Sequence, residues 1–130
     1  MMVDLSMFIR KYLGVASTGD TPGNQGQCVG LIENWLDANG KPHVPGNAAD
    51  LLANAPKSFY TLTLNSPANY PPVGAVVCWG PSWGGGFGHT AIVVASNVNK
   101  LVVFEQNNPT GAPPLVATHD YSGVVGWIRW

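Results

Sequence analysis

The thiols and imidazoles of this sequence are its candidate nucleophiles and bases, and there are five of them: Cys28, Cys78, His43, His89 and His119. Cys28 is the best placed for chemistry, because it begins a predicted amphipathic helix whose apolar residues recur at 28, 31, 32, 35 and 36. The first turn of a helix carries unpaired N–H groups and the positive end of the helix dipole. Both favour the thiolate, the form of cysteine that attacks a carbonyl carbon. Taken alone, however, Cys28 fits better as a small core residue at a helix start.

Two predicted strands place polar groups at one end of a hairpin. The apolar, β-branched segments 89–95 and 101–107 are separated by a turn short enough for antiparallel pairing. His89 begins the first segment, and Glu105 and Asn107 lie at the end of the second. Because alternate residues of a strand share a face, we expect these three side chains to lie together at one end of the sheet.

An imidazole beside a carboxylate would complete a catalytic set with the thiol. In that set Cys28 attacks, His89 accepts its proton, and Glu105 fixes the ring tautomer and stabilises the imidazolium. Asn107 would steady the same ring or polarise a substrate carbonyl. Each residue also has a simpler explanation, a strand-edge histidine or a solvated charge, but their joint occurrence favours the catalytic interpretation.

These residues need a scaffold that brings a helix start and two strand ends together. Ahead of the cysteine helix, Asp4 caps a predicted helix over 5–13 that ends at Gly14, and the cysteine helix itself ends near Asn39. Helices followed by an antiparallel sheet are the α+β pattern, and we expect one catalytic domain, residues 1–130, with about five to six strands. The remaining predicted elements are a short helix over 48–54 and strands over 59–64, 73–79, 115–118 and 124–130.

Three short motifs follow one another in a specific order: Gly26-Gln27-Cys28 at a helix start, Gly88-His89 at a strand start, and Phe104-Glu105-Gln106-Asn107 at a strand end. In this order they resemble the CHAP family, the cysteine, histidine-dependent amidohydrolases and peptidases, from about Asp20 to the last predicted strand. The resemblance implies a papain-like α+β fold with N-terminal helices packed on the sheet. It also implies cleavage of an amide bond in bacterial peptidoglycan, by an N-acetylmuramoyl-L-alanine amidase or an endopeptidase of the bacteriophage endolysin type. Cys28 would be the nucleophile and His89 the base, supported by Glu105 and Asn107.

Some members of that family bind calcium in the loop before the cysteine and just after it, using several aspartates. This loop offers Asp20, with Thr21 and Asn24 beside it, and Gly30 stands where a further acidic ligand could lie. Calcium takes six to eight oxygen ligands, usually with several carboxylates. One aspartate is too few, so we expect no metal site and no cofactor. The two distant cysteines and the three histidines show no zinc-ligand spacing either.

Several residues near the motifs are candidates for binding substrate. Gln27 would orient the cysteine loop or donate to an oxyanion, for which the backbone N–H of Cys28 is the favoured donor. The glycine-rich segment 84–88 lacks the Lys-Ser/Thr ending of a phosphate loop and leads into a strand. We therefore interpret it as the rim of a cleft, with Trp83 and Phe87 against the substrate. The sequence instead predicts buried positions for Trp79 and Cys78, and solvated positions for His43 and His119.

Composition argues against several other kinds of partner. The formal net charge is −1 and the Lys and Arg residues are scattered, so no basic stripe is offered to nucleic acid. No apolar run reaches the length of a membrane span. Arg10 and Lys11 follow the first apolar segment, whereas a signal peptide carries its positive charge ahead of it. We expect a monomer that acts on peptidoglycan and has no nucleic-acid or membrane partner.

A phage-encoded chain without an export signal would act from the host cytoplasm and reach the cell wall after release. A part of a virion, or of a larger secreted protein, fits the sequence equally. Two other functions remain open: a catalytically silent wall-binding or structural phage module, and a cysteine amidase acting on a small soluble amide. Activity on purified cell walls, compared with activity on small amides, separates these alternatives.

Overall fold

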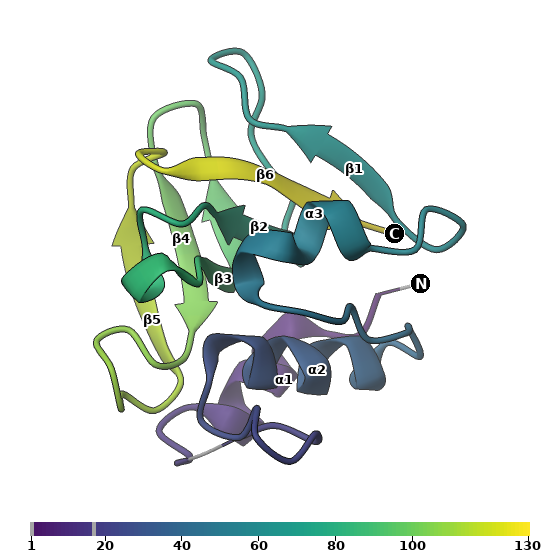
Figure 1. Ribbon diagram of the computed structural model, residues 1–130, viewed down its shortest axis with the longest axis vertical. Helices are drawn as coiled ribbons and strands as arrows, with labels where there is room; N and C mark the ends of the chain where they lie inside the picture. The colour runs from purple at the N-terminus through teal and green to yellow at the C-terminus, as the bar shows by residue number, and fades with distance from the viewer. Residues whose placement is uncertain (1, 17) are drawn as a thin grey trace.

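The computed structural model describes residues 2–16 and 18–130, so Met1 and Ser17, which begin the chain and the loop before the cysteine, lie outside the described residues. Helices come first and a sheet follows, and Figure 1 shows α1 and α2 together on one side of that sheet. This arrangement confirms the predicted α+β class. The elements are α1 (Leu5–Tyr12), α2 (Cys28–Ala38), η1 (Ala48–Asp50), α3 (Leu51–Asn54), β1 (Thr61–Leu64), β2 (Val76–Trp79), η2 (Gly84–Gly86), β3 (His89–Ser96), β4 (Leu101–Glu105), β5 (Leu115–His119) and β6 (Val124–Arg129).

The start of α1 follows a capping signal of the sequence. Asp4 precedes α1 and its carboxylate accepts a hydrogen bond from the Ser6 N–H at 2.9 Å. Cys28 is the first residue of α2, with Gln27 at the N-cap, so the thiol does stand at a helix start. None of the described helices is long and apolar enough to cross a membrane.

The six strands form one antiparallel sheet in the order β1-β6-β2-β3-β4-β5. β2 is buried along its whole length in the middle of the sheet, which explains its unbroken apolar sequence. The register pairs Trp79 of β2 with His89 of β3, and Glu105 of β4 with Leu115 of β5. The end of β2 and the end of β4 therefore lie on either side of the start of β3, where His89 stands.

Apolar side chains pack on both faces of the sheet. One cluster joins the sheet to the helices through residues such as Leu31 and Trp35 of α2 and Phe104 of β4. The other cluster contains Ala91 and Val93, together with Leu101, Val103 and Trp79 on neighbouring strands. Because alternate residues share a face, His89 and Glu105 lie on the same side as this second cluster, as the strand pattern predicts.

The sequence prediction was wrong about the end of one strand. It extended β4 to Asn107, whereas the strand ends at Glu105 and Asn107 has a positive φ of 65°. The chain turns there, with the Asn107 N–H bonded to the Ala112 carbonyl at 2.9 Å and the Asn107 side-chain oxygen accepting from the Gly111 N–H at 2.7 Å. Asn tolerates this left-handed conformation better than most residues do.

Candidate active site

A pocket of about 280 Å³ lies between the start of α2 and the start of β3. Cys28 and His89 both line it, as do Gln27 and Asn107. Cys28 is partly exposed, whereas His89 is 4% exposed. The thiol is therefore accessible to a bound molecule, while the imidazole is held in place by the protein around it.

The imidazole of His89 is paired with a buried carboxylate. Its Nε2 lies 2.8 Å from Oε1 of Glu105, and Glu105 is 1% exposed. Burial alone would lower the pKa of His89, but its interactions with Cys28 and Glu105 outweigh that effect and raise the pKa to about 9. An imidazolium beside the Cys28 thiol is thus stabilised well above neutral pH.

Glu105 is held by two further side chains. Nε2 of His119 lies 2.9 Å from the same Oε1, and the Asn108 amide donates to Oε2 at 3.3 Å. Burial would raise the pKa of Glu105, but the hydrogen bonds from His89 and His119 hold it below its usual range. The sequence prediction that His119 is solvated was wrong, because His119 ends a strand and its side chain is 17% exposed.

Asn107 and Gln27 meet across the pocket, 80 positions apart in the chain. The Asn107 side-chain nitrogen donates to Oε1 of Gln27 at 3.2 Å. The hydrogen-bond partner of Asn107 is thus the residue before Cys28, whereas Glu105 is the partner of the His89 ring.

Gln106 ties the loop before the cysteine to the end of β4. This residue is 1% exposed, and its amide bonds the backbone N–H, carbonyl and hydroxyl of Thr18, together with the carbonyl of Gln27. Sequence reasoning missed Gln106 as a site residue. Strand alternation could have predicted its position. If Glu105 points to one face of the sheet, Gln106 as the next residue points to the opposite face.

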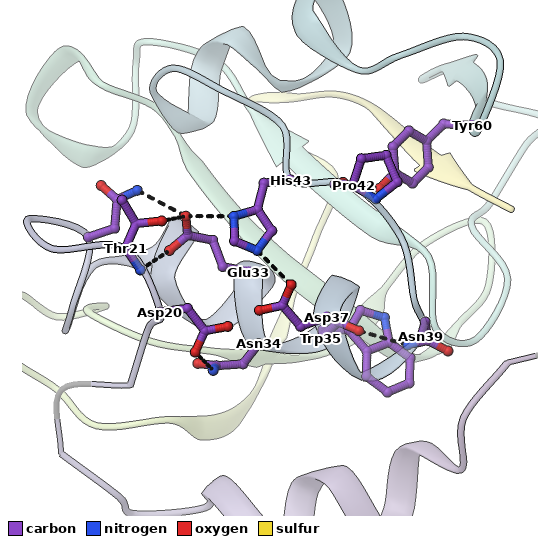
Figure 2. Close-up of polar contacts among 11 residues, drawn as sticks. Asp20, Thr21, Glu33, Asn34, Trp35, Asp37, Asn39, Pro42, His43 and Tyr60 are labelled. Carbon is purple, nitrogen blue, oxygen red and sulfur yellow. Dashed lines mark hydrogen bonds and ion pairs between the residues drawn. The ribbon is translucent and has the colours of Figure 1, made fainter.

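Glu33 organises the same loop from the helix side. Its carboxylate, on a residue only 7% exposed, accepts from the Thr21 N–H at 3.3 Å, the Thr21 hydroxyl at 2.6 Å and the Asn24 amide at 3.3 Å. Figure 2 shows His43 lying between Glu33 and Asp37. Its Nδ1 is 3.4 Å from Glu33, and its Nε2 is 2.7 Å from Asp37. His43 therefore contacts both carboxylates. The sequence prediction of a solvated position did not foresee these contacts.

Gly30 allows the loop to lie directly on α2. A Cβ at this position would lie 2.3 Å from the Asn24 carbonyl oxygen and 2.6 Å from that of Thr18, and both atoms belong to the backbone. No acidic ligand fits at position 30 while the loop keeps this course. The loop's backbone oxygens occupy that space.

The residues near the loop do not fit a calcium ion. Ligand atoms of Asp20, Asp37 and His43 lie within 4.8 Å of one another, but this set holds two carboxylates and one imidazole. Calcium prefers six to eight oxygens. Oxygens of these carboxylates are also engaged, since Asp20 accepts from the Asn34 amide at 2.9 Å and Asp37 contacts His43 (Figure 2).

Removal of metal ions is expected to leave the loop and the activity unchanged, because hydrogen bonds to Glu33 hold the loop. Exhaustive EDTA treatment should alter neither the melting temperature nor the catalytic activity. Glu33→Gln should lower the melting temperature equally with and without EDTA, since a charged acceptor of several hydrogen bonds is lost. A loss on EDTA treatment that calcium restores and magnesium does not would contradict this expectation.

The glycine-rich segment forms one rim of the pocket. Gly84, Phe87 and Gly88 line it, and the Phe87 side chain is 64% exposed. Trp83 lies behind the rim, where its ring stacks on that of His89 with centroids 5.8 Å apart and planes at 17°. Phe87 therefore borders the space open to a ligand, whereas Trp83 packs against His89.

Cys78 lies in a different environment from Cys28. It is fully buried in the helix-facing core, and its thiol donates to the Ala48 carbonyl at 3.0 Å. Burial raises the pKa of Cys78 to about 12, so it stays a thiol at neutral pH. The buried position predicted for this residue agrees with the structure.

A family model and a curated relative match this chain. The model for the CHAP domain matches residues 18–107. Endolysin PlyTW of Staphylococcus phage Twort is 32% identical over 79% of this chain, and the match covers 24% of that protein. The chain thus spans about a quarter of the length of this relative.

Several solved structures share the fold. Endolysin LysIME-EF1 has a TM-score of 0.76 at 24% identity, covering 98% of this chain and 64% of that one. Ly7917, solved with the hydrolysis product of MDP, has a TM-score of 0.73 at 19% identity, covering 94% and 59%. PlyC has a TM-score of 0.73 at 22% identity, covering 97% of this chain and 34% of that chain.

Proposed function

The chain belongs to the CHAP domain family, and we propose that it hydrolyses an amide bond of bacterial peptidoglycan with Cys28 as the nucleophile. One observation carries the proposal: Cys28 begins a helix and shares a pocket with His89, whose Nε2 is held by the buried Glu105. Thiol, imidazole and carboxylate in this order form a nucleophile–base–orienter set. Similarity to endolysins supports the cell wall as the substrate.

The reaction follows from the protonation states of these groups. An ionised Glu105 only accepts hydrogen bonds, so the neutral His89 ring carries its hydrogen on Nε2 and leaves Nδ1 free for the Cys28 thiol. Because the pKa of His89 is raised to about 9, the proton of the thiol already lies on Nδ1 at neutral pH, and the thiolate sulfur bonds to the amide carbon. When the tetrahedral intermediate collapses, the C–N bond breaks and the imidazolium gives its proton to the leaving amine. A thioester to Cys28 remains.

Hydrolysis of the thioester returns the enzyme to its starting state. His89 takes a proton from water, and the hydroxide formed attacks the thioester carbon. The C–S bond then breaks, which releases a carboxylic acid and the Cys28 thiolate. In both steps the negative oxygen is stabilised by the backbone N–H of Cys28 and by the side chain of Gln27, which Asn107 holds in place.

The substrate is an amide of the wall, either the bond between the sugar and the stem peptide or a bond within the peptide. Phe87 would contact the substrate at the rim of the pocket. Mass spectrometry of purified peptidoglycan digested by the protein identifies the new amine and carboxylate ends. An intact wall with a hydrolysed small amide would favour the soluble-amide alternative, and neither product would favour a silent wall-binding module.

We propose further that residues 1–130 form one catalytic domain that acts as a monomer. As an endolysin, it would be made in the host cytoplasm and would reach the wall after release. As part of a virion or of a larger secreted protein, it would use the same catalytic groups.

Iodoacetamide is expected to label Cys28 much faster than Cys78 at neutral pH. Cys28 is partly exposed at a helix start beside His89, whereas Cys78 is fully buried with its pKa raised to about 12. Peptide mapping after short labelling measures both rates in the same molecule. Faster labelling of Cys78 in the folded protein would remove the basis for choosing Cys28 as the nucleophile.

A further inference from the structure

We propose that His119 is a positioning residue of this active site, which holds Glu105 in the orientation that supports the His89 imidazolium. The inference rests on the proposed function, because it concerns the chemistry of Cys28 and His89. His119 lies beyond residues 18–107, the segment that the CHAP family model matches. It comes from β5, a strand that contributes no other group to the catalytic set.

One carboxylate oxygen receives both rings. Oε1 of Glu105 is 2.8 Å from Nε2 of His89 and 2.9 Å from Nε2 of His119. Since an ionised carboxylate only accepts, each neutral ring must carry its hydrogen on Nε2. The bond from His119 therefore fixes the position of the atom that selects the His89 tautomer. Asn108 holds the other oxygen, but at the longer distance of 3.3 Å.

Aromatic side chains enclose this arrangement. The His119 ring lies edge-on to Trp83 at 5.3 Å and 86°, and to Trp79 at 5.4 Å and 75°. Glu105 itself is 1% exposed. Solvent is therefore poorly placed to replace the His119 donor, and its loss would leave a buried oxygen with one donor fewer.

The charged and titratable groups that face Glu105 come from separate elements. His89 of β3 and His119 of β5 bond it directly, and Cys28 of α2 lies beyond His89 at the pocket. Without His119, the carboxylate can turn away from Nε2 of His89. The imidazolium then loses support, so the proton on His89 should be lost at a lower pH than in the parent protein.

Two substitutions separate the effect of the His119 hydrogen-bond donor from the effect of its aromatic ring. His119→Phe keeps an aromatic ring against Trp79 and Trp83 but cannot donate, whereas His119→Gln keeps a donor and loses the ring. We expect His119→Phe to lower kcat on labelled peptidoglycan about 10-fold with KM nearly unchanged, as for loss of one hydrogen bond to a charged group. His119→Gln should retain most of the activity. In His119→Phe alone, the alkaline limb of the kcat/KM profile should move to lower pH, and the rise of Cys28 alkylation with pH should move to higher pH, because a weaker imidazolium supports the thiolate less.

Controls distinguish positioning from packing. Thr118→Phe and Thr118→Gln introduce the same two residues at an exposed position of the same strand and should match the parent protein. Melting temperatures report any loss of folding, and His119→Phe should cost little further activity in a Glu105→Gln background. Parent-like activity of His119→Phe, or equal losses in both His119 variants with unchanged alkylation profiles, would overturn the inference. The alkylation assay needs no peptidoglycan, so it still tests His119 if wall hydrolysis, and with it the proposed function, fails.

Discussion

Cys28→Ala is expected to abolish peptidoglycan hydrolysis, with a loss in turnover of about 10⁴-fold or more, because no thioester can form without the sulfur. Alanine keeps the helix start, so folding should be retained. Turnover on labelled cell walls and the melting temperature measure the two effects separately. Cys28→Ser, which keeps a hydroxyl of similar size, should be nearly as inactive, since a serine hydroxyl is a much weaker nucleophile than a thiolate.

Cys78→Ser is the matched control for that experiment. The change replaces the other thiol, and the new hydroxyl can still donate to the Ala48 carbonyl in the core. Burying a hydroxyl in place of a thiol should lower stability by about 1–2 kcal/mol while leaving turnover unchanged. Full activity in Cys28→Ala, or an equal loss of turnover in folded Cys78→Ser, would require a different nucleophile.

Local signals in the sequence predict most of the fold. Asp4 and Gly14 delimit the first helix, and the spacing of apolar residues after Cys28 defines the second. The apolar strands are found to within a few residues, because β-branched runs between turn residues are strong signals. The end of β4 was missed at Asn107, since alternation continues in the sequence where the backbone turns.

The pairing of His89 with Glu105 was predictable because it needs only strand alternation and a hairpin. Their distance of 2.8 Å agrees with that prediction. The role of His119 was not predictable in the same way. His119 lies opposite Leu101 in the register of β5 with β4, four residues from Glu105, so its contact depends on how side chains cross the face of the sheet.

The loop before the cysteine shows a second limit of local patterns. Its carboxylate comes from Glu33, on the helix that follows, and its buried amide comes from Gln106, directly after β4. Helix periodicity places Glu33 on α2 but does not say which loop folds over it. Contacts between segments so distant in sequence are set by tertiary packing.

Glu105→Gln is expected to lower turnover about 10- to 10³-fold while weakening substrate binding much less. In a comparable triad, replacing the charged orienter by its amide costs about 10⁴-fold in turnover. The loss should be smaller here, because the helix start favours the Cys28 thiolate without help from the carboxylate. Asp120→Asn, which removes the same charge from an exposed position after β5, should leave turnover unchanged.

The environment of Glu105 explains why an amide of the same shape cannot replace it. If the Gln oxygen faces His89 and His119, its NH₂ group faces the Asn108 amide, and two donors meet. If the amide is turned, its NH₂ group faces both rings and forces their hydrogens onto Nδ1, which removes the base from Cys28. Neither orientation stabilises the imidazolium, whose pKa of about 9 depends partly on Glu105. The alkaline limb of kcat/KM should therefore move down from about pH 9, and the pH profile of Cys28 alkylation should change with it. Unchanged turnover with unchanged profiles would show that Glu105 only fills space beside His89, and Asn107 would then be the first residue to test as the orienter.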